Sequence, residues 1–151
     1  MRNRELGIYV HIPFCKHKCD YCDFVSYCNK DNLIEDYITA LKKEIKLQNI
    51  QSWITTIYIG GGTPSYIDSK YIKQIMKEIQ KKNINKEAEI TLEVNPGTAT
   101  RQKLRDYKEC GINRLSIGLQ ATQDSMLKQI GRIHNYSQFL ETYNMAREIG
   151  F

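Results

Sequence analysis

The segment "TTIYIGGGTPS" at residues 55–65 joins a short β-strand pattern to a glycine-rich loop. Its first residues are mostly β-branched or aromatic, which favours a strand, and the glycines that follow end it. Three further runs share this composition: "GIYVHI" at 7–12, "AEITLEV" at 88–94 and "NRLSIGL" at 113–119. Apolar residues occupy consecutive positions in these runs, which is typical of parallel strands buried on both faces. The sequence therefore predicts four strands.

Helical patterns separate and follow the predicted strands. Apolar periodicity or terminal signals mark five segments, at 33–45, 72–79, 100–110, 122–130 and 137–149. Asn32 with Glu35 is a candidate capping pair, Asp68 or Ser69 is a candidate N-cap, and Gly111 is a candidate C-terminal stop. The alternation of strand and helix predicts right-handed βαβ units, and hence an α/β fold with a parallel sheet covered by helices.

The length of the chain limits how much of such a fold it can form. A complete barrel of strands and helices takes about 250 residues, whereas this sequence has 151. We therefore expect residues 1–151 to form the N-terminal portion of a barrel, about four β/α units, with its last strand at an open edge. The remaining strands of such a barrel are expected to be absent.

Composition narrows the classes of partner and compartment. The net charge is +5, but the lysines fall mainly on the polar faces of predicted helices, so we predict no nucleic-acid partner. The sequence holds no signal-peptide pattern and no run near the ~20 apolar residues of a membrane span. These features predict a cytoplasmic protein without a transmembrane segment, and leave only a peripheral membrane association open. Five cysteines in a reducing compartment indicate a metal or cluster site.

The unusual residues follow the predicted strands. A cysteine-rich loop comes after the first strand, "GGGTPS" after the second, Glu93 ends the third, and Gln120 follows the fourth. In parallel α/β folds the carboxyl ends of the strands meet at one rim, where chemistry gathers. These four features are therefore expected to form one site.

Three of the cysteines have a close, defined spacing: Cys15, Cys19 and Cys22. A structural zinc ion would need a fourth ligand, for which Cys28 or His17 is available, but zinc ligands usually come as two separated pairs. Three thiolates can instead hold a four-iron cluster and leave one iron open to another ligand. The spacing favours the cluster. Cys28 and Cys110 are interpreted as small apolar side chains.

Other residues near the rim have less specific interpretations. The glycine-rich loop lacks the lysine of a phosphate-binding loop, so an amino-acid-like ligand that needs polar backbone partners fits it better. Glu93 is interpreted as an acceptor for hydroxyls or an ammonium, and Gln120 more weakly so. Arg132 is either a solvated charge or a carboxylate clamp. His11 is interpreted as a buried, hydrogen-bonded histidine, and His134 as a loop residue.

Several motifs together resemble a known family. "IYVHIPFCKHKCDYCDF", "GGGTPS", "LEVNPG" and "GINRLSIGLQ…LKQIGRIH" occur in the expected order over most of the chain. They are similar to the radical S-adenosylmethionine (radical SAM) enzymes, in the branch of the oxygen-independent coproporphyrinogen III oxidases, and closest to the HemW haem chaperones. The resemblance implies the N-terminal part of a partial (β/α)6 barrel with parallel strands. Members of the family continue through two more barrel strands and a C-terminal domain, which are expected to be absent from residues 1–151.

The resemblance also implies cofactors and the residues that hold them. A [4Fe-4S] cluster would bind Cys15, Cys19 and Cys22, and S-adenosylmethionine (SAM) would chelate the open iron. Residues that would contact the first SAM are Tyr9, Gly61 and Glu93. In the oxidases that bind a second SAM, the matching positions are Tyr21, Gly62, Thr63, Gln120 and Arg132.

One position departs from the oxidase pattern. The oxidases carry a further cysteine two residues after the third, where this sequence has Phe24. A phenylalanine supplies no sulfur, which favours a HemW-like chaperone that binds haem and delivers it to an acceptor protein. The alternative is oxidative decarboxylation of coproporphyrinogen III through a 5′-deoxyadenosyl radical. Either function implies an electron donor such as flavodoxin or ferredoxin.

Overall fold

The computed structural model describes residues 5–151, which contain a four-stranded parallel sheet in the order β1-β2-β3-β4. The strands are β1 (Glu5–Ile12), β2 (Trp53–Gly61), β3 (Ile84–Val94) and β4 (Arg114–Ile117). Each strand pairs with the next one along the chain, and every pairing is parallel. The predicted α/β class and the parallel sheet are therefore confirmed.

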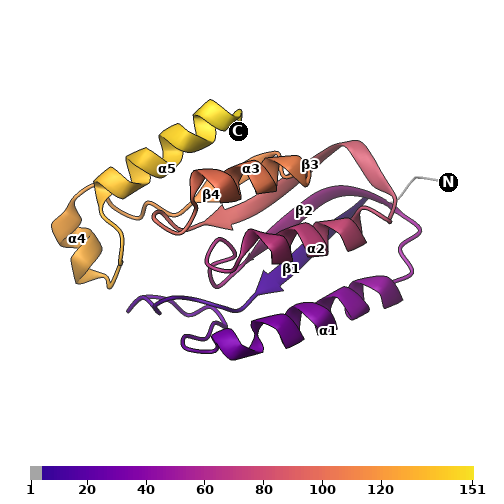
Figure 1. Cartoon of the computed structure of the whole chain (residues 1–151), viewed down its shortest axis with the longest axis horizontal. Helices are drawn as coiled ribbons and strands as arrows, with labels where there is room; N and C mark the ends of the chain where they lie inside the picture. Colours follow the sequence, from indigo (N-terminus) through magenta and orange to yellow (C-terminus); the bar gives the residue numbers. More distant parts are fainter. Residues whose placement is uncertain (1–4) are drawn as a thin grey trace.

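Helices lie on one face of this sheet, as Figure 1 shows. They are α1 (Ile34–Leu47), α2 (Ser69–Ile79), α3 (Arg101–Glu109) and α5 (Tyr136–Ile149). The short α4 (Asp124–Gln129) lies beyond the carboxyl ends of the strands. α1 packs beside α2, α2 beside α3, and α3 beside α5, so the helices follow the order of the strands that they connect. No helix within residues 5–151 is long and apolar enough to cross a membrane.

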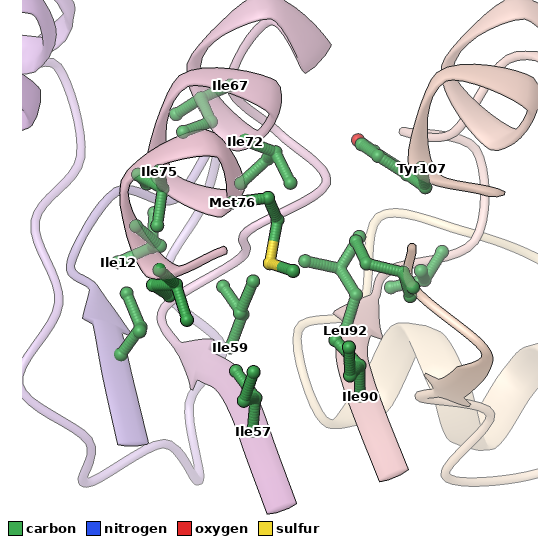
Figure 2. Close-up of a cluster of buried hydrophobic side chains, with 14 of the residues drawn as sticks. Ile12, Ile57, Ile59, Ile67, Ile72, Ile75, Met76, Ile90, Leu92 and Tyr107 are labelled. Atoms are coloured by element: carbon green, nitrogen blue, oxygen red, sulfur yellow. The ribbon is translucent and has the colours of Figure 1, made fainter. Parts of the chain in front are cut away.

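The main core lies between the sheet and α2 (Figure 2). Ile57 and Ile59 of β2 and Leu92 of β3 face Ile72 and Met76 of α2, and all five side chains are fully or almost fully buried. Burial of side chains of this size contributes about 1.5–3 kcal/mol each relative to leaving them exposed. This layer fixes the strands, and through them the loops at their carboxyl ends.

We expect Leu92→Ala to lower the free energy of unfolding by about 2–5 kcal/mol, because it leaves a cavity in the fully buried layer. Urea denaturation followed by circular dichroism measures the change. Leu47→Ala is the matched control, since the Leu47 side chain is 76% exposed and its loss should change stability little. Equal losses in the two variants would contradict this description of the core.

The other face of the sheet differs from the prediction. Its side chains are polar or aromatic, and alternate with the core residues along each strand: Tyr9, His11, Tyr58, Thr91 and Glu93. The expectation of apolar residues on both faces was therefore wrong. The consecutive apolar runs include tyrosines, which supply an aromatic ring with a hydroxyl to a face that carries the functional site.

The strand boundaries also differ from the prediction, most of all in β3 and β4. β3 starts at Ile84 and not at Ala88, because Ile84 pairs with Ile54 ahead of a register shift. β4 spans only four residues, and the chain leaves the sheet after Ile117. The polar residues at 85–87 carry no strand signal by themselves and lie at the register shift, between the paired residues Ile84 and Glu89.

The helix ends are a mixture of confirmed and wrong predictions. Asp68 caps α2 by accepting a hydrogen bond from the Lys70 backbone N–H, as predicted. Gly111 follows the last residues of α3 with a left-handed φ of 96°, which confirms it as the C-terminal stop of that helix. The capping pair of Asn32 and Glu35 is wrong. A single 3-10 turn at Asp31–Leu33 precedes α1, and no side chain caps the helix.

Candidate functional site

The loops at the carboxyl ends of the strands enclose a cavity of ≈ 210 Å³. Ten of the eleven predicted site residues line it: Cys15, Cys19, Tyr21, Cys22, Gly61, Gly62, Thr63, Glu93, Gln120 and Arg132. Tyr9 lies outside the cavity lining. Segments separated by up to about a hundred residues thus meet at one rim, as the position of the strand ends requires.

Backbone hydrogen bonds close the ends of the cysteine loop. Phe14 and Tyr27 form an isolated parallel bridge. The Cys15 N–H donates to the Tyr27 carbonyl at 3.0 Å, and the Tyr27 N–H donates to the Pro13 carbonyl at 2.7 Å. The residues between them therefore form a compact loop directly after β1.

Inside this loop, Cys19 and Cys22 belong to one tight turn, and Cys15 lies apart from them against the glycine-rich loop. The Cys22 N–H donates to the Cys19 carbonyl at 3.0 Å, which closes a tight turn and brings these two residues together. Cys15 is buried, and its Sγ lies 3.4 Å from the Thr63 hydroxyl of the glycine-rich loop. All three thiols line the same cavity, so their arrangement suits a ligand larger than one ion.

The geometry of the thiols bears on the choice between zinc and a cluster. In residues 5–151, no three His, Cys, Asp or Glu side chains lie close enough together to hold a single metal ion. A four-iron cluster makes a different demand, because each thiolate binds its own iron and the sulfurs need not converge on one point. Three thiols around one cavity therefore fit a cluster.

The glycine-rich loop packs tightly against the start of the cysteine loop. The Gly62 N–H donates to the Ile12 carbonyl at 2.8 Å, and the Thr63 N–H donates to the Phe14 carbonyl at 2.9 Å. A Cβ atom at Gly62 would lie 2.9 Å from the Phe14 carbonyl and 3.0 Å from the Cys15 sulfur. The absence of a side chain is thus needed for this close approach.

Glu93 is held in place from two sides. The Tyr58 hydroxyl donates to Oε1 at 2.7 Å, and the Gly61 backbone N–H donates to Oε2 at 3.1 Å. Burial, and then the hydrogen bond to Glu93, raise the pKa of Tyr58, so its hydroxyl stays a donor over the physiological range. The carboxylate is therefore fixed at the cavity while part of its acceptor capacity remains available.

Arg132 connects the far side of the cavity to the cysteine loop. Its guanidinium donates to the Gly118 carbonyl at 2.9 Å, to Asn95 Oδ1, to the Tyr21 hydroxyl at 3.4 Å and to Cys19 Sγ at 3.7 Å. These contacts mean that Arg132 is not a freely solvated charge, so that interpretation was wrong. Its interpretation as a carboxylate clamp stays a prediction.

His17 lines the cavity, and the other two histidines, His11 and His134, lie near it and are hydrogen-bonded. His11 Nε2 donates to the Val25 carbonyl at 2.8 Å, and its Nδ1 lies 3.0 Å from the Tyr9 hydroxyl, but the ring is only half-buried. His134 is a loop residue, as predicted, and is 4% exposed. Burial, and then the charge of Arg132, lower the pKa of His134. It therefore accepts from Arg132 as a neutral ring.

The remaining cysteines lie outside the cavity lining. Cys110 follows α3, donates to the Tyr107 carbonyl at 3.3 Å, and burial raises the pKa of its thiol to about 11. Cys28 lies close to the cysteine loop, where burial, and then Cys15, raise the pKa of its thiol. A raised pKa keeps a thiol protonated, which agrees with the interpretation of both as small, unreactive side chains.

Several lining residues were not predicted from the sequence. Asn95, Ser116 and Gly118 all line the cavity and lie at or just after the ends of β3 and β4. Functional residues gather at the carboxyl ends of parallel strands, and this rule, which predicts Glu93 and Gln120, also predicts these three when it covers every residue at a strand end. Tyr58 does not line the cavity but holds Glu93, and it was not predicted because it lies within β2 and not at its end. Strand periodicity places it on the same face as Gly60.

Comparison with protein families gives a match to the radical SAM superfamily over residues 9–151. The chain belongs to the radical SAM superfamily. Membership of this superfamily implies SAM and an iron–sulfur cluster. The matched region starts within β1 and includes every loop that lines the cavity.

Individual relatives agree with this assignment. The radical SAM chain is 39% identical to the haem chaperone HemW of Bacillus subtilis and 47% identical to that of Buchnera aphidicola, over 95% and 86% of its length. It spans only 39% and 36% of the length of these curated relatives. A solved structure of coproporphyrinogen III oxidase (HemN) from Escherichia coli has a TM-score of 0.90 and 31% identity, covering 99% of this chain and 36% of that one.

Proposed function

We propose that this chain is the cofactor-binding part of a haem chaperone of the HemW type. The observation that carries the proposal is the single cavity shared by three thiols, a glycine-rich loop, a fixed carboxylate and an arginine. The relatives that are named haem chaperones match nearly the whole chain.

In the proposed function, Cys15, Cys19 and Cys22 hold a [4Fe-4S] cluster. The support is their common position at the cavity and the tight turn between Cys19 and Cys22. Three protein ligands leave one iron open for another ligand. Thr63, 3.4 Å from Cys15 Sγ, would orient that thiol from outside.

SAM would occupy the rest of the cavity. Gly61 and Glu93 would bind its polar groups, with Tyr9 contributing from the neighbouring strand. Five further residues of the cavity lining would contact a second SAM molecule: Tyr21, Gly62, Thr63, Gln120 and Arg132. Bound together, the cluster and SAM supply one-electron chemistry, while the protein positions and shields them.

Phe24 favours the chaperone over the oxidase. Its ring lines the cavity and is 66% exposed, so an apolar surface lies where the oxidases carry a further sulfur ligand. An exposed aromatic ring suits contact with a flat apolar ligand such as haem. The proposed partners are haem, a haem-accepting protein and an electron donor such as flavodoxin or ferredoxin. The second candidate is the coproporphyrinogen III oxidase reaction, supported by the likeness to HemN.

Anaerobic reconstitution tests this proposal in two stages. The reduced chain should give the EPR signal of a four-iron cluster, and the signal should change when SAM is added. Haem should then bind, seen as a shifted Soret band, whereas coproporphyrinogen III should remain unconverted. Conversion of the porphyrinogen would favour the oxidase, and zinc without acid-labile sulfide would reject both.

A further inference from the structure

The side chain of Arg132 reaches one of the proposed cluster ligands directly. Its Nη1 lies 3.7 Å from Cys19 Sγ, although the two residues are 113 positions apart. The same nitrogen lies 3.4 Å from the Tyr21 hydroxyl. A guanidinium that donates to a sulfur brings both an N–H dipole and a positive charge to it.

Other contacts fix this guanidinium in place. Arg132 Nε donates to His134 Nδ1 at 3.3 Å, and Nη2 donates to the Gly118 carbonyl at 2.9 Å and to Asn95. His134 is 4% exposed, so the ring that accepts from Nε is itself fixed by burial. With Nε and Nη2 engaged, the planar geometry of the group directs Nη1 toward Cys19.

The backbone next to Arg132 also packs against the cysteine loop. Gly131 has φ 72°, and a Cβ atom there would lie 3.0 Å from the Asp20 carboxylate and 3.1 Å from the Asp20 backbone nitrogen. The two loops are therefore in contact at both a backbone and a side-chain position. The approach of Arg132 to Cys19 is part of this packing and does not depend on one flexible side chain.

We propose that Arg132 sets the reduction potential of the cluster by donating a hydrogen bond to the Cys19 sulfur. The inference rests on the proposed function, because it requires the cluster to bind Cys19. Reduction adds a negative charge to the cluster, and hydrogen bonds to its sulfurs are among the factors that set its potential. A nearby cation and N–H donor stabilise the reduced form more than the oxidised form, so they raise the potential.

The test is a redox titration of the reconstituted chain, followed by EPR, in the absence of SAM. Leaving SAM out separates this role from any contact between Arg132 and the cofactor. We expect Arg132→Gln to shift the one-electron reduction equilibrium about tenfold toward the oxidised cluster, which corresponds to 59 mV. Arg132→Lys keeps the charge but loses the planar fork, and should give a smaller shift. Arg105→Gln is the control, since Arg105 is an exposed arginine of α3.

Unchanged potential in Arg132→Gln, with a full cluster, would overturn the proposal. An equal shift in Arg105→Gln would also overturn it, because net charge alone would then explain the effect. If Arg132→Gln assembles no cluster, the hydrogen bond is tested in the unmodified chain labelled with ¹⁵N-arginine. Pulsed EPR of the reduced cluster should then detect a magnetic coupling to an arginine nitrogen, and the absence of this coupling would reject the hydrogen bond. A cluster that persists without Cys19 would instead reject the ligand assignment.

Discussion

Cys19→Ala is expected to abolish cluster assembly, with iron and acid-labile sulfide falling to background after anaerobic reconstitution. Three thiolates are the protein ligands of the proposed cluster, so the loss of one leaves two irons without a protein ligand. Cys19 is a more informative position than Cys15. Cys15 is buried and close to Thr63, so its replacement would also disturb the packing, whereas Cys19 lies on the loop and is only partly buried.

Two other cysteines provide matched controls for this result. Cys28→Ala removes a thiol near the same loop, and Cys110→Ala removes one at the C-terminal end of α3, outside the cavity lining. Both variants should retain the iron and sulfide content of the unmodified chain. A full cluster in Cys19→Ala, or its loss in Cys28→Ala, would mean that the ligand set is wrong. Circular dichroism of each apo variant checks that the fold is retained.

Local patterns in the sequence predict most of the fold. The strands at 7–12, 55–60 and 88–94 fall within β1, β2 and β3, because β-branched residues fill the layer beneath the helices. The early start of β3 at Ile84 and the early end of β4 at Ile117 depend on pairing with a neighbouring strand. Such pairing is a tertiary effect that residue preferences do not contain.

The membership of the site could be predicted better than its internal contacts. The carboxyl ends of parallel strands must share one rim, which placed the cysteine loop, Gly61, Glu93 and Gln120 together. The same rule says nothing of distances between side chains. The approach of Arg132 to Cys19 needs the loop after β4 to fold back across the rim, and no local pattern encodes that. Tyr58 holds Glu93 for a similar reason, since its role depends on the register of β2 against β3.

Gly61→Ala is expected to remove the response of the cluster signal to SAM and to destabilise the chain. Gly61 has φ 113°, a conformation that costs other residues about 1–3 kcal/mol. A Cβ atom there would also lie 2.6 Å from the His11 ring. His11 would have to move, which would break its 2.8 Å hydrogen bond to the Val25 carbonyl and remove one contact that holds the cysteine loop against β1. The Gly61 N–H that holds Glu93 would shift as well.

Gly150→Ala separates the cost of crowding from the cost of backbone strain. Gly150 has φ 94°, but nothing lies within 4 Å of a Cβ atom at that position. This control should lose stability through the backbone alone and should keep the full EPR response to SAM. Gly61→Ala should lose more stability in urea denaturation and should also lose the response. If both variants responded to SAM like the unmodified chain, the contact between Gly61 and His11 would not shape the cofactor cavity. The positioning of the cysteine loop would then come from the backbone bonds among Pro13, Cys15 and Tyr27 and from those that the glycine-rich loop donates to Ile12 and Phe14.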